Sequence, residues 1–303
     1  MKCKSSYLSL LASGELELRV QSARVHLASC DVCPLGCRVN RLADGKGLCQ
    51  TGRLAQISSY GSHHGEEKPI SGWRGSGTIF FSHCNLRCVF CQNYDISQMG
   101  VGEEISGRHL ASIMLCLQDM GCHNINLVSP SHVIPQILEA VQIAARAGLN
   151  LPLVYNSGGY DSLEMLGLLD GVIDIYMPDM KFSNEDIAYK YSGISDYPTI
   201  NQTAVREMHR QVGDLRLDEG GIAIRGLLVR HLVLPNNLAG TKGILHFLAN
   251  SVSRNVYLNL MDQYHPCYHA AEYPELNRRI SAKEYDRVIQ LAQNFGLTRL
   301  DHN

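Results

Sequence analysis

The strongest chemical signal in the chain is a cysteine triplet, Cys84, Cys88 and Cys91, in C-x3-C-x2-C spacing. The triplet directly follows a short apolar run that predicts a strand. Thiolates at this spacing can bind one iron–sulfur cluster from a single loop. Such clusters commonly have four cysteine ligands, so a loop that supplies three leaves one iron free to bind another group.

A second set of cysteines precedes the triplet in C-x2-C-x3-C-x11-C spacing. We call these the leader cysteines: Cys30, Cys33, Cys37 and Cys49. Proline and glycine mark turns between them. Four soft ligands in a short loop would suit tetrahedral zinc or a second iron–sulfur cluster, and the residues leave that choice open. The alternative is a set of buried cysteines without a ligand.

Composition bounds the class of protein. The 303 residues are 45% hydrophobic and 18% charged, which suits a large α/β domain with a small appendage. A formal net charge of −2 gives no electrostatic signature of nucleic-acid or anionic-membrane binding. We see no transmembrane run and no signal peptide, and we expect a cytoplasmic protein. In that compartment the 11 cysteines favour metal ligation over disulfides.

Strand and helix patterns alternate from Thr78 onward. Short apolar runs predict strands at 78–83, 124–128, 152–156, 172–176, 228–234 and 256–261. Helical patterns lie between or after them, at 108–121, 133–147, 161–169, 200–212, 240–251 and 281–294. This alternation implies a parallel sheet with right-handed crossovers. Six units fall short of the eight that close a TIM barrel, so we expect an open, partial (β/α)6 TIM-like barrel.

The N-terminal part has a different pattern. Residues 5–28 predict two short helices that lead into the leader cysteines. The Gly-, Ser- and His-rich stretch 51–77 predicts strands and loop that join this part to the barrel, and His63-His64 is interpreted as a polar loop pair. We therefore divide the chain into a cysteine-rich module at 1–72 and the barrel at 73–303.

Polar or ionisable groups follow every predicted strand. In barrels of this kind the functional residues lie at the C-terminal ends of the strands. The candidates are Ser129, Asn156, Asp179, Lys181, Arg230 and His265. Asp179 and Lys181 point the same way on an extended chain, so a structural ion pair is the alternative for these two. The whole series favours a functional edge of the sheet.

The triplet, with an aromatic residue before its third cysteine (Phe90-Cys91), resembles the motif of the radical S-adenosylmethionine (SAM) superfamily. The continuation through Asn93, the Pro-Asp-Met-Lys at 178–181 and the later Arg230 are similar to the branch around the pyruvate formate-lyase activating enzymes. With the leader cysteines and the string 261–266 (Met-Asp-Gln-Tyr-His-Pro), the chain resembles the PflX-type activating-enzyme family from about residue 14 to about residue 295.

The resemblance implies a specific chemistry. The triplet would hold a [4Fe-4S] cluster, and SAM would chelate the fourth iron through its amino and carboxylate groups. One electron from the reduced cluster would break the C5′–S bond and leave methionine and a 5′-deoxyadenosyl radical, which abstracts a hydrogen atom. Flavodoxin or ferredoxin would donate the electron. The expected substrate is a protein or peptide, as in activation of a glycyl-radical enzyme, with a small molecule as the alternative.

The resemblance also implies roles at the strand ends. Phe90 and Asn93 would flank SAM near its adenine, and Asn156 stands where the activating enzymes carry an acid. Asp179 and Lys181 would lie near the ribose and methionyl end. Arg230 and His265 would face SAM from the last strands.

One departure from the branch lies after the second predicted strand. The usual Gly-Gly-Glu turn is replaced here by the segment 129–132, Ser-Pro-Ser-His. Proline has no N–H, and His132 stands in place of the acid. We therefore expect Ser129 or Ser131, or their backbone carbonyls, to recognise the methionyl amine.

Other classes of function compete with this one. A barrel lyase would use Lys181 as a Schiff-base amine and keep the cysteines as structural groups. A metal-binding scaffold or electron-transfer protein would bind clusters without cleaving SAM. Among the remaining cysteines, Cys116 and Cys122 are expected in the core, and Cys267 is a spare thiol near the predicted site for which packing is favoured over a radical relay.

Overall fold

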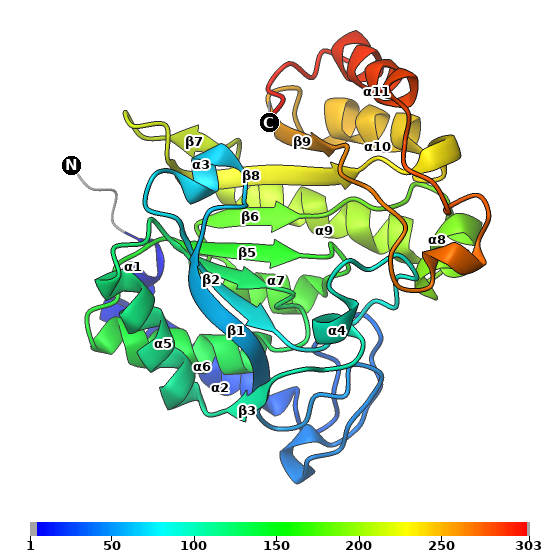
Figure 1. The fold of residues 1–303 in the computed structure, drawn as a ribbon. Coiled ribbons are helices and arrows are strands. Elements are labelled where there is room, and N and C mark those ends of the chain that lie inside the picture. Colours follow the sequence, from blue (N-terminus) through cyan, green and yellow to red (C-terminus); the bar gives the residue numbers. More distant parts are fainter. Residues whose placement is uncertain (1–4, 302–303) are drawn as a thin grey trace.

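The computed structural model describes residues 5–301, which form an open sheet covered by helices (Figure 1). Its parallel strands follow one another in chain order: β2 (Ser76–Phe81), β4 (Ile125–Val128), β5 (Leu153–Ser157), β6 (Ile175–Pro178), β8 (Ala223–Leu232) and β9 (Tyr257–Met261). These are the strands that the apolar runs predict. The partial (β/α)6 architecture is therefore confirmed.

Helices connect these strands and cover the outer face of the sheet. They are α5 (Gly107–Asp119), α6 (Ile134–Arg146), α7 (Leu163–Leu169), α9 (Tyr197–Val212), α10 (Thr241–Phe247), the π-helical turn η3 (Leu248–Val252) and α11 (Ala282–Asn294). Helix α8 (Glu185–Ser192) instead packs against the loop after β2. Ile137, Val141 and Ala144 on α6 are fully buried, as their helical spacing predicts. Helix α8 has no counterpart among the predicted elements.

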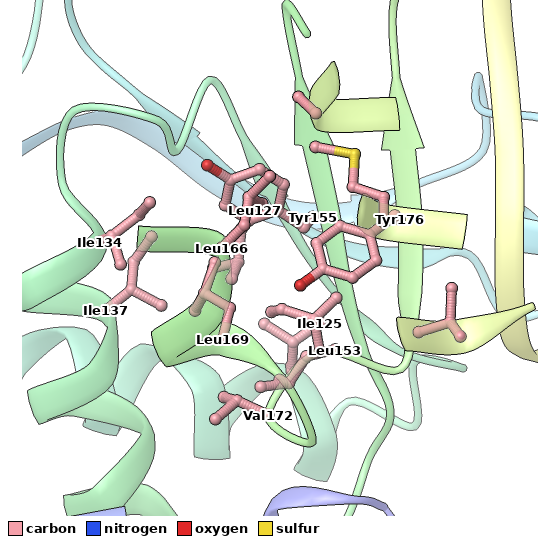
Figure 2. Close-up of a cluster of buried hydrophobic side chains, with 14 of the residues drawn as sticks. Ile125, Leu127, Ile134, Ile137, Leu153, Tyr155, Leu166, Leu169, Val172 and Tyr176 are labelled. Carbon is pink, nitrogen blue, oxygen red and sulfur yellow. The ribbon is translucent and has the colours of Figure 1, made fainter. Parts of the chain in front are cut away.

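The main core lies between the sheet and these helices. Figure 2 shows its central part, where side chains from β4, β5 and β6 meet those of α6 and α7. The labelled members are Ile125, Leu127, Ile134, Ile137, Leu153, Tyr155, Leu166, Leu169, Val172 and Tyr176. Alternate residues of each strand enter this core, so the residues between them face the inside of the open barrel.

The N-terminal segment packs against the main body. Helices α1 (Tyr7–Ser13) and α2 (Glu15–Val25) contact α6, and the Tyr7 hydroxyl donates a hydrogen bond of 2.9 Å to the carbonyl of Leu151. Strand β1 (Ala55–His63) pairs antiparallel with β2, and β3 (Glu103–Ile105) pairs antiparallel with β1. At the other side, β7 (Arg216–Leu217) pairs antiparallel with β8. The division of the chain after residue 72 remains a proposal based on the cysteine pattern.

A short helix closes one end of the barrel interior. Helix α3 (Lys68–Ser71) lies over the inner face of the sheet (Figure 1), where Ile70 packs with Val154, Ile175 and Leu228. Small elements in the loops are η1 (Arg41–Ala43), α4 (Tyr94–Ser97), η2 (Pro235–Asn237) and η4 (Ala270–Glu272). Because α3 and its Ile70 fill this end of the barrel interior, the end at the carboxyl termini of the strands stays open. Among the described helices, none is long and apolar enough to cross a membrane.

The buried His231 on β8 predicts a pH dependence of stability. Its Nδ1 lies 2.7 Å from the Met180 carbonyl and its Nε2 lies 2.9 Å from the Thr241 hydroxyl. The carbonyl can only accept, so Nδ1 carries the proton. Burial lowers the pKa of His231 from 6.5 to about 4. The unfolded chain therefore binds the second proton, which makes the imidazolium, more tightly than the folded chain does. The free energy of unfolding falls as the pH drops from 6.5 toward 4.

The free energy of unfolding of the wild type should decrease between roughly pH 7 and pH 5. In a His231→Gln variant we expect this decrease to be smaller by about 2 kcal/mol. Chemical denaturation at the two pH values measures this difference. His109→Gln, at an exposed position on α5, is the control. An unchanged slope in the His231 variant would show that this side chain does not carry the dependence.

Candidate functional site

A cavity of about 240 Å³ opens at the carboxyl ends of the parallel strands. The triplet lines one wall. The other walls come from β4, β5, β6, β8 and β9 and the residues after them: Val128, Ser129, Asn156, Ser157, Gly158, Asp179, Lys181, Arg230, Leu232, Met261 and Gln263. The sheet thus brings together residues that are far apart in the sequence, as the strand-end argument predicts.

Strand periodicity explains why these side chains meet. Val128 on β4 pairs with Asn156 on β5, and Asp179 is bridged to Arg230 of β8. Leu127 and Tyr155, one residue earlier on β4 and β5, point into the outer core. Because successive side chains alternate between the faces of a strand, the following residues point inward. A one-residue slip would remove all of them from the cavity.

The triplet loop is held by backbone hydrogen bonds from distant segments. Val89 N–H donates to the Tyr191 carbonyl at 2.9 Å, and His269 N–H donates to the Val89 carbonyl at 2.9 Å. The Asn85 side-chain amide donates to the Tyr160 carbonyl at 2.7 Å. These bonds fix the loop against α8 and the segment after β9. The positions of the sulfur atoms are therefore set by contacts with the rest of the fold as well as by the loop itself.

The triplet fits a cationic ligand. Burial raises the pKa of Cys84 to about 11 and that of Cys88 to about 12. Thiolates at such positions need a neighbouring positive charge, which a metal centre supplies. The Leu86 N–H faces the Cys84 sulfur at 3.4 Å, and the Ser97 hydroxyl lies 3.1 Å from the Cys91 sulfur. Such donors stabilise metal-bound sulfur.

The arrangement of the sulfurs distinguishes two kinds of centre. Within residues 5–301, no three His, Cys, Asp or Glu side chains are grouped to hold a single metal ion. In a cuboidal cluster each cysteine binds a different iron, so the sulfurs stand further apart than the ligands of one ion. The donor set of the triplet, three thiols on one cavity, therefore fits an iron–sulfur cluster.

A charged network lies opposite the triplet. Arg230 Nε donates to Asp179 Oδ1 at 2.9 Å, and its Nη2 donates to Asn156 Oδ1 at 2.6 Å. Lys181 Nζ donates to Asp179 Oδ2 at 2.6 Å. One carboxylate thus holds two cations in place at the cavity wall.

The network sets the charge states of its members. Burial opposes ionisation of Asp179, but Arg230 and Lys181 outweigh it and hold the pKa of Asp179 below its ordinary value. Burial likewise disfavours the charge of Lys181, yet the Asp179 carboxylate raises the pKa of Lys181 above its ordinary value. Lys181 is therefore a cation, and this opposes a Schiff-base role, which needs the neutral amine.

Two acidic residues of the site were not identified from the sequence. Glu66 Oε2 lies 3.5 Å from Arg230 Nη1, and Glu66 Oε1 accepts from Asn126 at 3.0 Å. Glu67 accepts from Asn259 at 2.9 Å and is only 5% exposed. The available signal was the pair of asparagines inside otherwise apolar strands, because a buried amide requires a partner.

The other predicted residues lie around the cavity in different ways. Phe90 lines it and packs edge-on against Phe182 and Tyr264, with ring centroids 6.0 and 6.1 Å apart. Asn93 lines it just before α4. His265 is outside the lining set, and its Nδ1 lies 3.3 Å from Nε2 of Gln92, a lining residue. Gln92 and Gln263 are lining residues that were not selected from the sequence.

The turn after β4 separates the two candidate serines. Ser129 lines the cavity, with a positive φ of 59° and its N–H donating to the Asn156 carbonyl. Ser131 is buried beside Asp161, to which its side chain is hydrogen-bonded. Of the two, Ser129 is placed to meet a ligand.

The leader cysteines lie outside this cavity but next to the triplet loop. Leu35, between them in sequence, packs in the same apolar cluster as Cys88 and Phe90. The Arg87 guanidinium donates to the Leu48 carbonyl. The N-terminal cysteine segment therefore supports the triplet loop directly.

Comparison with known proteins identifies the fold and the family. No protein-family model matches the chain. A radical SAM methyltransferase from Sphaerobacter thermophilus matches 73% of this chain at 15% identity with a TM-score of 0.50. The match covers 64% of that enzyme, so this chain spans less than two thirds of its length. The fold is therefore that of a radical SAM enzyme's partial barrel.

Two further proteins are similar. Streptococcus suis SuiB, in a structure with S-adenosylmethionine, matches 70% of this chain and 45% of its own at 10% identity, with a TM-score of 0.47. In sequence, the uncharacterized protein MJ0674 of Methanocaldococcus jannaschii is 32% identical over 290 residues, which are 93% of this chain and 79% of that protein. This chain therefore belongs to the same protein family as MJ0674.

Proposed function

We propose that this protein is a radical SAM enzyme that cleaves SAM reductively at a [4Fe-4S] cluster held by the triplet. The observation that supports the proposal best is that the triplet and the polar ends of the strands line one cavity. Three thiols leave a cluster with an open iron, and the opposite wall carries the groups that a zwitterionic cosubstrate needs.

Cys84, Cys88 and Cys91 would hold the cluster, which would supply the one-electron reduction needed for cleavage of the C5′–S bond of SAM. The chain's own residues bind and orient SAM. Arg230 and Lys181 present cations, Asp179 and Asn156 present oxygen acceptors, and Ser129 presents a hydroxyl for the methionyl amine. Phe90 and Asn93 bound the adenine side. A one-electron donor of the flavodoxin or ferredoxin class supplies the electron.

Loss of the triplet is the first test. We expect Cys84→Ala to reduce 5′-deoxyadenosine formation to background, because the cluster loses one of its protein ligands. Anaerobic incubation with SAM and dithionite, followed by chromatography, measures the product. Cys116→Ala is the matched control, because Cys116 is exposed on α5 and not in the core as predicted, whereas Cys122 is buried. Undiminished product from the Cys84 variant would contradict the proposal.

Glu66 provides a test of the charged wall. Glu66→Gln removes the negative charge 3.5 Å from Arg230 but keeps an amide oxygen for Asn126. We expect KM for SAM to rise about tenfold, the cost of one charge-assisted contact of about 1.5 kcal/mol, while kcat changes little. Glu103→Gln, exposed on β3, should behave as wild type. Equal KM values in the two variants would exclude Glu66 as a positioning residue.

We further propose that the substrate is a protein or peptide, as for enzymes that activate glycyl-radical proteins. Exposed apolar side chains follow the triplet directly: Met99 is 68% exposed and Val101 is 54% exposed. Tyr268, 39% exposed, stacks on Tyr94 with ring centroids 5.1 Å apart. Met99 and Val101 follow the lining residues Ser97 and Gln98 in sequence, and exposed apolar side chains there suit an extended polypeptide better than a small polar metabolite.

Deuterium transfer identifies the substrate class. Enzyme, SAM and dithionite are incubated with a lysate from cells grown in deuterated medium, divided into a protein fraction and a small-molecule filtrate. We expect deuterium in the 5′-deoxyadenosine formed with the protein fraction, since the radical takes its hydrogen from the substrate. Label from the filtrate alone would assign a small-molecule substrate. The Cys84→Ala enzyme is the control for exchange.

A further inference from the structure

Arg41, on η1, carries a buried charge without an acidic partner. Its side chain is 1% exposed. Its Nε donates to the Gly52 carbonyl at 2.9 Å, and its Nη1 donates to the His132 carbonyl at 2.7 Å. Nη2 has no hydrogen-bond partner, and within residues 5–301 Arg41 forms no ion pair. A guanidinium cannot lose its proton, so this burial is costly unless a negative charge lies nearby.

The nearest candidate for that negative charge is sulfur. Arg41 Nη1 lies 3.8 Å from the Cys30 sulfur. Cys33 lies within electrostatic range of the other three leader thiols. A thiolate-bound centre, either one zinc ion or one iron–sulfur cluster with four cysteines, carries a net negative charge that balances a buried cation.

The backbone gathers the leader cysteines into one site. Cys30 N–H donates to the Val39 carbonyl at 2.9 Å and Arg38 N–H donates to the Cys30 carbonyl at 2.8 Å, which closes the loop that holds Cys33 and Cys37. The turn in which Gln50 N–H donates to the Gly47 carbonyl at 3.0 Å carries Cys49.

Gly47 permits the close approach of the two loops. A Cβ at residue 47 would stand 2.6 Å from the Cys37 sulfur. A side chain there would displace this thiol from its neighbours. The glycine is thus explained by the thiol that it faces, and not by its backbone angle.

We propose that the leader cysteines bind a second metal centre as thiolates, with Arg41 as its buried counter-cation. The ligand is a thiophilic metal, and iron in a cluster is favoured over zinc, because no three such side chains within residues 5–301 are grouped around a single ion. The centre lies beside the loops after β2 and β4, because Arg87 reaches Leu48, Arg41 reaches His132 and Leu35 packs with Cys88. It stabilises the segment that supports the triplet.

The test isolates this centre from the SAM site. In a chain with all of the triplet changed to alanine, metal that survives reconstitution and gel filtration belongs to the leader cysteines. We expect either the iron and sulfide of one cluster or one equivalent of zinc, measured by elemental analysis and by absorption. Iron with sulfide and zinc are supplied in separate arms, so the two forms are distinguished. This readout does not depend on SAM cleavage.

Two further variants complete the test in that background. Cys33→Ser should remove the metal, whereas Cys116→Ser, outside the site, should retain it. Arg41→Met should release metal to a chelator at least about tenfold faster, equivalent to about 1.4 kcal/mol, and Arg41→Lys should restore part of the retention by restoring the charge. Metal-free protein in both arms, or equal retention by Cys33→Ser, would overturn the proposal. Circular dichroism checks that each variant is folded.

Discussion

The site depends on the burial of the Cys84 and Cys88 thiols, because a thiolate without a nearby positive charge is unstable there. Burial raises the pKa of Cys84 and Cys88 to about 11 and about 12, so their sulfurs ionise only beside a cation. Hydrogen bonds to Val89 and Asn85 keep the loop from moving its sulfurs into solvent. A metal centre bound by these sulfurs, as proposed above, would supply that charge at the point where the carboxyl ends of the strands meet.

Buried charged side chains lie at both proposed ligand sites, paired at one and unpaired at the other. At the proposed SAM site, Asp179 and Glu66 hold Arg230 and Lys181 in place without a ligand, which would reduce the ordering needed on binding. At the leader cysteines the buried cation is unpaired, because the guanidinium of Arg41 lacks an anion. The two regions share an apolar cluster through Leu35, so a metal bound at the leader cysteines would also support the triplet loop.

The fold could be predicted from the sequence because local apolar patterns indicate the parallel strands and the main helices. The stretch 51–77 predicted strands without bounds, because the serines, glycine and histidine of 58–63 show little apolar alternation, and pairing with β2 defines β1 there. Strand β3 was not predicted, and it forms by pairing with β1. The strand-end rule found Asn156, Asp179, Lys181 and Arg230, which the structure brings to one cavity. It could not find Glu66, because a loop contact with Arg230 depends on the folded chain.

Mössbauer spectroscopy of the 57Fe-loaded protein tests the central claim most directly, because it reports the ligands of each iron. If the triplet leaves one iron of its [4Fe-4S] cluster without a protein ligand, SAM will change the isomer shift of that iron alone, toward the value of a site with added nitrogen and oxygen ligands. A spectrum that SAM leaves unchanged, from protein with a full cluster, would contradict the account.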